Sequence, residues 1–282
     1  MLQYFKMLLS GDDCLKKNYT TQGVAISLLK AILYFGLWIL VQFIVVNLAA
    51  SVLYLKFPSA DEYKMTEMIN GLSLELNVIV GCLTVLTIAI LAKAQRDTLS
   101  KRANIDKYPR QFMLTVIIMG VATAYAIMLI MGLLQKAEVF PQSWVESQNS
   151  TYSDVYSASA LMQFISVGFV APLAEEVLFR GCILGVLKKE MHPWAAIIIS
   201  AALFGIAHGT PIGIIYSTAL GIIMGWLTVT FKSIVPSLYF HMAYNCAVAY
   251  SGGVSLGIAV LSLPILIFEI MSIKNYFRGK KE

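Results

Sequence analysis

Apolar stretches long enough to cross a lipid bilayer recur along almost the whole chain, and this repetition restricts the fold more than any other feature. A helix needs about 20 apolar residues to span a hydrocarbon core about 30 Å thick. Of the 282 residues, 58% are hydrophobic and only 13% are charged, unlike the composition of a soluble domain. Hydropathy predicts eight spans, at residues 31–54, 71–92, 112–135, 159–187, 194–208, 212–231, 234–250 and 255–273. We therefore expect a polytopic, multi-pass protein of the cell membrane.

The predicted spans should all be α-helices, which gives an all-α fold. Within lipid, every backbone N–H and C=O group must find a partner inside the protein, so only helices and closed barrels cross membranes. A barrel strand would alternate polar and apolar residues, whereas runs such as 78–83 and 197–199 do not alternate.

The lysines and arginines outside the spans predict the orientation of the chain. With the N-terminus inside, 17 of them lie on the inner side and only Lys56, Lys64 and Lys136 lie on the outer side. Because basic residues accumulate on the cytoplasmic side of membrane proteins, both termini are predicted to be cytoplasmic. The net charge of +5 then results from topology, so the lipid bilayer is the expected partner and nucleic acid is not.

A cluster of charged residues, Glu175, Glu176 and Arg180, interrupts the fourth predicted span. One ionised side chain at the centre of a bilayer costs at least ~2.5 kcal/mol, so such residues pair with one another or serve a function. Glu176 and Arg180 are four residues apart with the acid first, the better arrangement for an ion pair on a helix. Glu175 points about 100° away around the helix axis and has no local cation. It is therefore the candidate catalytic carboxylate, with Glu176 and Arg180 as its structural support.

Two of the three histidines, His208 and His241, also lie within predicted spans, and Asn245 shares a helix face with His241. Counted from the inner ends of their spans at 1.5 Å per residue, these three residues and Glu175 lie roughly 14 to 21 Å from the cytoplasmic side. We therefore expect all four side chains to occupy one layer of the membrane.

Pairs of glycines spaced by four residues occur three times in this half of the chain. Small residues at this spacing let helix backbones approach closely in lipid, which would bring polar groups on different helices within reach. Helix contacts are therefore predicted at Gly181 and Gly185, Gly205 and Gly209, and Gly221 and Gly225.

Three motifs follow one another on separate predicted spans: E-E-x-x-x-R at 175–180, F-x-x-x-H at 204–208 and H-x-x-x-N at 241–245. In this order they resemble the CPBP family of CAAX proteases and bacteriocin-processing intramembrane proteases, which includes the type II CAAX prenyl endopeptidases. The resemblance covers about residues 159–250, the predicted catalytic core. An N-terminal transmembrane scaffold at 1–158 precedes it, and a last span with a cytoplasmic tail follows at 251–282.

The resemblance implies an intramembrane endopeptidase that hydrolyses a peptide bond with a water molecule activated by glutamate. By motif position, Glu175 would be the general base and His208 its partner, while His241 and Asn245 would stabilise the oxyanion. These residue types suit the roles, since a carboxylate can take a proton from water and an amide can donate to developing negative charge.

The same side chains suggest a second chemistry. One glutamate and two histidines, here Glu175, His208 and His241, are also a ligand set for a catalytic divalent metal such as zinc. The compact H-E-x-x-H pattern of soluble zinc proteases is absent from the chain. The sequence leaves metal dependence open.

Two other functions fit a polytopic chain with buried charges. One is a catalytically silent protein, such as a bacteriocin-immunity factor or a modulator of a sensor kinase, but the complete motif set favours catalysis. The other is a proton-coupled transporter, which predicts polar residues along a path across the bilayer and not in one layer. The leading prediction is an endopeptidase, in a bacterial cell, whose substrate is a membrane-associated peptide or protein reached from the cytoplasm.

Overall fold

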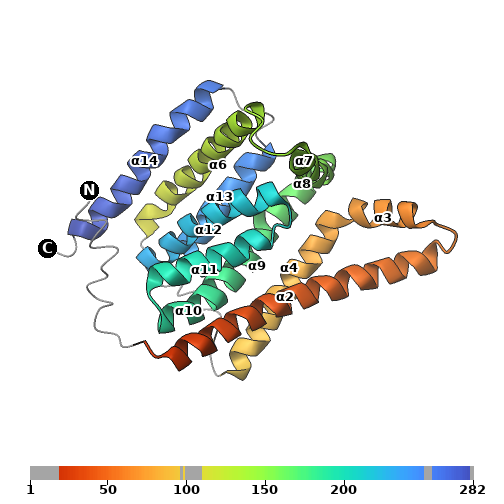
Figure 1. Cartoon of the computed structure of the whole chain (residues 1–282), viewed down its shortest axis with the longest axis horizontal. Coiled ribbons are helices and arrows are strands. Elements are labelled where there is room, and N and C mark those ends of the chain that lie inside the picture. The colour runs from red at the N-terminus through yellow and green to blue at the C-terminus, as the bar shows by residue number, and fades with distance from the viewer. Residues whose placement is uncertain (1–18, 96–97, 99–109, 251–255, 280–282) are drawn as a thin grey trace.

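The computed structural model describes residues 19–95, 98, 110–250 and 256–279, and every regular element in these ranges is helical (Figure 1). The predicted all-α fold is confirmed. A short 3-10 helix, η2 (Arg110–Phe112), precedes α6, and two π-helices, η3 (Phe164–Val170) and η4 (Glu176–Ile183), lie between α8 and α10. The α-helices are α2 (Thr21–Lys56), α3 (Glu62–Gly71), α4 (Ser73–Ala94), α6 (Met113–Lys136), α7 (Gln142–Ser157), α8 (Ala160–Gln163), α9 (Ala171–Glu175), α10 (Leu184–Glu190), α11 (Pro193–Ile206), α12 (Pro211–Phe231), α13 (Val235–Tyr250) and α14 (Leu256–Gly279).

The helices form a bundle with the charged motif at its centre. α6 packs between α13 and α14, α13 lies beside α12, and α12 packs along α11 (Figure 1). At the other edge, α2 contacts α4 and α10. The η4 helix, which carries Glu176 and Arg180, contacts α2, α4, α11 and α12, so other helices surround it.

Five of the eight predicted spans correspond to helices that are long and apolar enough to cross a membrane, which supports a polytopic membrane protein. The predicted spans 159–187, 194–208 and 234–250 are helical as well, but they do not meet this criterion within the described residues. α11 has 14 residues and α13 has 16, fewer than the about 20 of a spanning helix. The fourth predicted span is divided between α-helical and π-helical turns. The predicted number of eight spans is therefore not confirmed.

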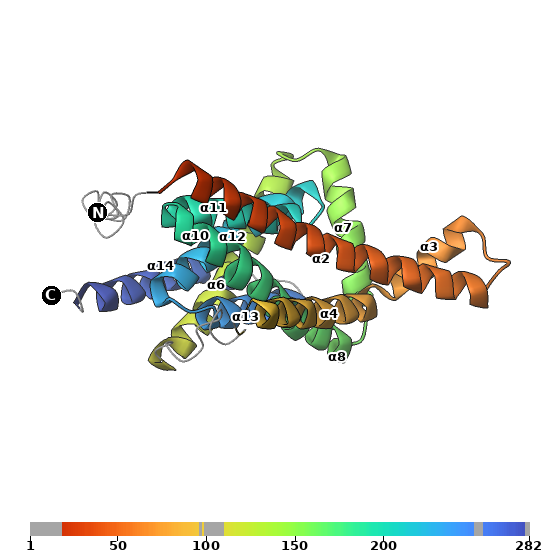
Figure 2. The ribbon, with the colours of Figure 1, turned by 90° about the horizontal axis from the view of Figure 1, so that it is seen from below.

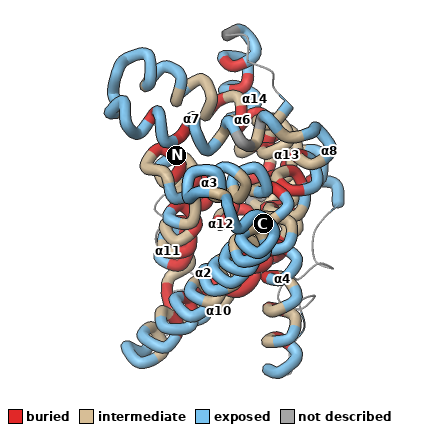
Figure 3. Tube along the Cα trace, turned by 90° about the vertical axis from the view of Figure 1, so that its right-hand side faces the viewer, coloured by how far each residue is buried: buried red, intermediate tan, exposed pale blue. Residues whose placement is uncertain are grey.

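The surface of α2 is the one expected for a helix in contact with lipid. Large apolar side chains such as Leu29, Leu33 and Phe43 are 57%, 61% and 63% exposed, and most of the helix is exposed in Figure 3. With 36 residues, α2 is about 54 Å long at 1.5 Å per residue and extends with α3 beyond the rest of the bundle (Figure 2). The start of α2 and the end of α14 lie at the same end of the bundle. The charge distribution of the sequence predicts that this end faces the cytoplasm.

Three segments without a strong apolar signal are also helical. The segment 136–158 between the third and fourth predicted spans contains α7, and the connection before the second span contains α3. α2 begins at Thr21, well before the predicted residue 31. Side-chain caps start two of these helices, since Thr20 Oγ1 accepts from Gly23 N–H at 3.0 Å and Asp61 Oδ1 accepts from Lys64 N–H at 2.8 Å. Hydropathy misses helices of this kind because their residues are largely polar.

The fourth predicted span is one continuous helical run from Ala160 to Glu190, but it is not a regular α-helix. Ala171 N–H donates to Ser166 O and Leu184 N–H donates to Phe179 O, both five residues back. Such π-helical turns are rare and occur frequently at functional sites. The pair of glutamates lies at the change from α9 to η4.

Three of the six paired glycines allow α11 and α12 to pack closely. A Cβ atom on Gly221 would lie 2.9 Å from Ala201 Cα, and one on Gly225 would lie 2.9 Å from the Ile197 side chain. A Cβ atom on Gly205 would collide with α12. The predicted helix contact is confirmed at these three positions.

The other three glycines have different surroundings, so the predicted helix contact is wrong for them. Gly209 has a φ of +73° and lies in the turn after α11. At Gly181 and Gly185 a Cβ atom would meet only carbonyl oxygens of their own helix, at 3.8 Å.

The Gly221→Ala variant is expected to lower the free energy of unfolding by about 1–3 kcal/mol, because the added methyl group would overlap the backbone of α11. Thermal unfolding of the protein purified in detergent measures the change. Gly36→Ala is the matched control, since it adds the same methyl group to α2 where nothing lies within 4 Å. Equal melting temperatures for the two variants would show that the contact between α11 and α12 does not need glycine.

Candidate active site

The buried pair of Glu176 and Arg180 forms the base of the candidate active site. Arg180 Nη1 lies 3.0 Å from Glu176 Oε1, and the two side chains are only 1% and 0% exposed. Arg180 also donates from Nη2 to Gly221 O at 3.4 Å, and its guanidinium lies over the Phe204 ring at 4.4 Å from the centroid. The predicted ion pair is present, and it connects η4 to α11 and α12.

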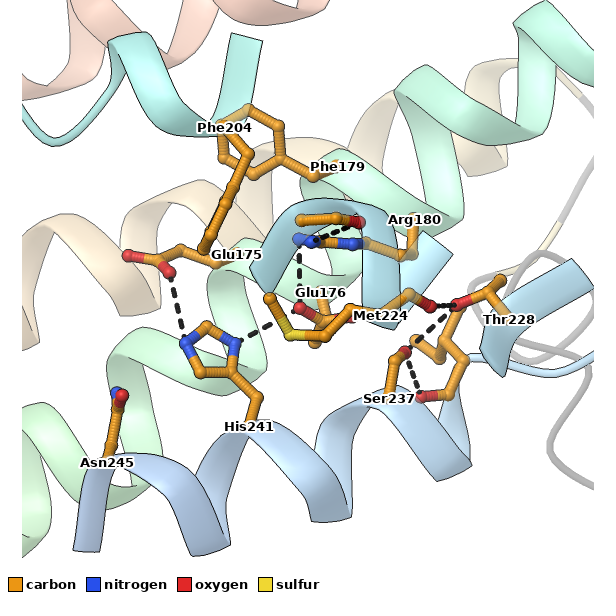
Figure 4. A network of polar contacts seen from close by, with 12 residues as sticks. Glu175, Glu176, Phe179, Arg180, Phe204, Met224, Thr228, Ser237, His241 and Asn245 are labelled. Atoms are coloured by element: carbon orange, nitrogen blue, oxygen red, sulfur yellow. Dashed lines mark hydrogen bonds and ion pairs between the residues drawn. The ribbon is translucent and has the colours of Figure 1, made fainter. Parts of the chain in front are cut away.

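His241 on α13 lies between the two glutamates (Figure 4). Its Nδ1 is 3.1 Å from Glu176 Oε1, and its Nε2 is 3.7 Å from Glu175 Oε2. The hydrogen bond made by one ring nitrogen of a histidine determines the protonation of the other. Glu176 therefore connects Arg180 to His241 and orients the imidazole ring, in addition to neutralising the arginine.

The two glutamates differ in their access to a bound molecule. The Glu175 side chain is 22% exposed, whereas that of Glu176 is fully buried. Glu175 also lines a cavity of about 220 Å³ that Glu176 does not line. Of the two carboxylates, Glu175 is the one that can contact water or substrate.

His208 is held by the turn that ends α11. Its Nδ1 lies 2.9 Å from Phe204 O, and because a carbonyl oxygen only accepts, Nδ1 carries the hydrogen. In the neutral ring, Nε2 is then an acceptor. The positive φ of Gly209 lets the chain reverse directly after His208, and Thr210 Oγ1 caps α12 by accepting from Gly213 N–H at 3.1 Å.

Phe204, the first residue of the F-x-x-x-H motif, packs against both histidines. Its ring centroid lies 4.8 Å from that of His208 and 5.7 Å from that of His241, with each pair of rings steeply inclined. Its side chain is buried. Aromatic rings at this spacing and angle attract one another, so Phe204 restricts the positions of the two imidazoles.

One cavity brings the four predicted catalytic side chains together. Its volume of about 220 Å³ is enclosed mainly by α7, α9, α12 and α13. A water molecule occupies roughly 30 Å³ in the liquid, so the cavity has room for water and part of a substrate. Its lining includes Glu175, His208, His241 and Asn245.

Asn245 is anchored at the edge of this group. Its Nδ2 donates to Val167 O on η3 at 2.8 Å, and Figure 4 shows its amide apart from the contacts between His241 and the glutamates. The amide nitrogen carries two hydrogens. One hydrogen therefore anchors the side chain, and the other is available for a molecule in the cavity.

Two helices outside the predicted catalytic core of 159–250, α4 and α7, also line the cavity. Asn77 on α4 donates to Ser166 Oγ at 3.0 Å, although the first three spans were predicted to be scaffold. In the sequence, Asn77 could be noticed as a polar residue within the apolar span 71–92. The residues that α7 contributes did not stand out in the sequence, because they lie in a polar segment between two predicted spans. These residues are Gln148, Thr151, Tyr152 and Val155.

Two hydrogen bonds hold α7 against the cavity. Tyr152 and Tyr216 form a hydrogen bond between their hydroxyl groups at 3.0 Å, and Thr210 Oγ1 donates to Gln148 Oε1. Tyr216 belongs to α12, and Thr210 is the residue that caps this helix. α7 is thus attached at the start of α12.

The cavity lies far from the lysines that predict the cytoplasmic side. α12 begins beside it and ends at Phe231, about 30 Å away at 1.5 Å per residue, where Lys232 follows. The bordering helix α7 belongs to the segment predicted to be outside. Under the predicted orientation, the cavity therefore adjoins the outer segment, and the expectation that substrate arrives from the cytoplasm is not supported.

The predicted zinc ligands do not form a metal site in the described part of the chain. No three His, Cys, Asp or Glu side chains there are grouped so that they could hold a metal ion. Both ring nitrogens of His241 face carboxylates, and Nδ1 of His208 faces a backbone carbonyl. A carboxylate and a backbone carbonyl are also the usual partners of the second ring nitrogen in metal-binding histidines, so these Nδ1 contacts leave metal dependence open.

Two comparisons with known proteins found a match, and the family model matches the segment that carries the three motifs. The model of a family described as type II CAAX prenyl endopeptidase Rce1-like matches residues 157–247. A Bacillus subtilis (strain 168) protein named "Putative membrane peptidase YdiL" is 33% identical over 101 residues. The matched region is 36% of this chain and 41% of the Bacillus protein, so less than half of that relative is covered. No solved structure matches the chain.

Proposed function

Because residues 157–247 match the family model described as type II CAAX prenyl endopeptidase Rce1-like, we propose that the chain is a CPBP-family intramembrane endopeptidase acting on a membrane-associated peptide or protein. The observation that carries this proposal is the shared cavity, in which Glu175 and His208 come together from different helices. A carboxylate and a histidine that face one water-sized space are the groups needed to activate water for hydrolysis.

In this proposal Glu175 is the general base. It takes a proton from a water molecule as the water oxygen attacks the carbonyl carbon of the scissile bond. The protonated Glu175 then returns the proton to the leaving amine when the C–N bond breaks. His208 orients the water through Nε2, since its Nδ1 is bonded to Phe204 O.

Asn245 and His241 are proposed to stabilise the oxyanion. Asn245 donates the amide hydrogen that Val167 O does not accept. His241 Nε2 donates only when the ring carries both protons, because the Nδ1 hydrogen is directed to Glu176. One well-placed oxyanion donor contributes about 10² to 10³ in rate.

An apolar cavity of about 260 Å³ adjoins the site and indicates the kind of substrate. It shares part of its lining with the site cavity, including Tyr152 and Tyr216. Its other lining residues include Ile127, Met128 and Met131 of α6. Methionine side chains adapt to differently shaped apolar groups. We therefore propose that the substrate places a bulky apolar side chain next to the scissile bond.

The test is a comparison of membrane peptidomes from cells that carry the wild-type chain and the Glu175→Ala variant. An uncleaved precursor is expected to accumulate in the variant, with an apolar residue beside the position at which the wild type cuts. Glu269→Ala is the matched control, because Glu269 is a buried glutamate on α14 that does not line the cavity. The proposal is wrong if no precursor distinguishes Glu175→Ala from this control.

The transporter alternative requires a continuous polar path through the bundle. Among the described residues, the site cavity shares no lining residue with the cavity at the lysine-bearing end, and Glu176 lies buried between them. This separation favours hydrolysis. Proton flux into proteoliposomes that is lost in Glu175→Gln would instead support transport.

A further inference from the structure

A second and larger cavity, of about 660 Å³, lies at the opposite end of α12 from the candidate active site. Four lysines line it, namely Lys30, Lys188, Lys189 and Lys232, and none of its described lining residues is acidic. We propose that this basic cavity binds the phosphate-bearing headgroup of an anionic membrane lipid.

Arg180 forms part of the inner wall of the basic cavity. The residue is only 1% exposed, and within the described residues its Nε has no hydrogen-bond partner. The Nε atom itself is not accessible from the cavity, so Arg180 acts on a bound headgroup through its charge at the inner wall and not through this donor.

Gly181 and Gly185 keep the inner wall of the basic cavity open. Both line the cavity, and a Cβ atom at either position would not touch a neighbouring helix. A side chain at either position would project into the space beside Arg180. The role of the two glycines is therefore to leave room for a ligand.

The shape of the basic cavity fits a lipid better than a peptide substrate. Its wall on α2 includes Leu33 and Leu37, and Leu33 is 61% exposed on the apolar surface of that helix. Acyl chains can follow this surface into the bilayer while the headgroup contacts the lysines. Basic pockets between transmembrane helices on the cytoplasmic side are typical lipid-headgroup sites.

A peptide in the basic cavity could not reach Glu175. The two cavities have no described lining residue in common, and Glu176 is fully buried between them. Lysines are frequent on the inner side of membrane proteins because they set the orientation of the chain. This role does not explain why four lysines surround a cavity of about 660 Å³ whose wall includes two glycines.

The experiment measures lipid binding to the purified full-length protein by native mass spectrometry, with phosphatidylglycerol and phosphatidylcholine titrated separately. Phosphatidylglycerol is expected to bind and phosphatidylcholine is not. The double variant Lys30→Gln/Lys188→Gln is expected to bind phosphatidylglycerol roughly 30-fold more weakly, given the usual contribution of a lysine near a membrane surface. Gly185→Leu is expected to weaken binding as well, because it fills the cavity without changing the charge.

The matched control is Lys56→Gln/Lys136→Gln, which removes the same charge outside the basic cavity and is expected to keep the wild-type affinity. Equal weakening by both lysine pairs would show non-specific attraction and overturn the proposal. Equal binding of the two lipids would also overturn it. So would complete competition by inorganic phosphate or by a substrate peptide, which would identify a free anion or a peptide as the ligand. Melting temperatures close to that of the wild type confirm that the variants are folded.

Discussion

The Glu175→Gln variant is expected to cleave its substrate about 10²- to 10⁴-fold more slowly than the wild type, the usual contribution of a general base. Glutamine has nearly the same size and can still hydrogen-bond to water, but it cannot take a proton from it. The distance of 3.7 Å between Glu175 Oε2 and His241 Nε2 is too long for a strong hydrogen bond, so the substitution should leave the fold intact. The rate is measured in single turnovers with the protein and its precursor reconstituted in liposomes.

Glu269→Gln serves as the control for this measurement, because it changes a buried glutamate outside the cavity. It is expected to cleave at the wild-type rate. A near-normal rate for Glu175→Gln would contradict its role as the base and would direct attention to His208 Nε2. A loss of substrate binding in Glu175→Gln would instead show that the carboxylate holds the substrate.

The Arg180→Met variant is expected to lose about 3–5 kcal/mol of stability, the usual result of removing one partner from a buried ion pair. Methionine fills a similar length, but it leaves the carboxylate of Glu176 with 0% exposure and without its cation. The contacts of Arg180 with Gly221 O and the Phe204 ring are lost as well. Unfolding in a denaturing detergent or by heat, followed by size-exclusion chromatography, measures the loss.

A double variant separates stability from catalysis. Glu176→Gln/Arg180→Met removes both charges, so it is expected to recover most of the stability that Arg180→Met loses. It should still cleave poorly, because His241 Nδ1 then faces a neutral amide in place of the Glu176 carboxylate. If the double variant is as unstable as Arg180→Met, the unpaired buried carboxylate is not the cause of the instability.

The residues of the candidate site could be selected from the sequence because each breaks an apolar pattern. Glu175, His208 and His241 are conspicuous in spans that contain few other polar residues. The ion pair between Glu176 and Arg180 could also be predicted, since it depends only on a spacing of four residues along one helix. Contacts within a single helix are a local property of the chain.

The partners of these residues could not be predicted in the same way. Tyr152 and Gln148 border the cavity from α7, a largely polar helix that a search for apolar spans does not detect. Asn77 was visible as a polar residue, but its approach to Ser166 joins segments 89 residues apart. The position of the cavity beside α7 could not be predicted for the same reason, because it depends on how α7 packs against α12.

The sequence by itself determined that this chain is an all-α membrane protein with a CPBP-like group of polar residues. Apolar length, charge and motif order are local properties, and they are readable without coordinates. Only the tertiary structure decided that His241 joins the two glutamates, that α7 borders the site, and that Gly181 and Gly185 line a basic cavity. These features depend on how distant helices rotate and pack against one another, and no local pattern in the chain specifies that.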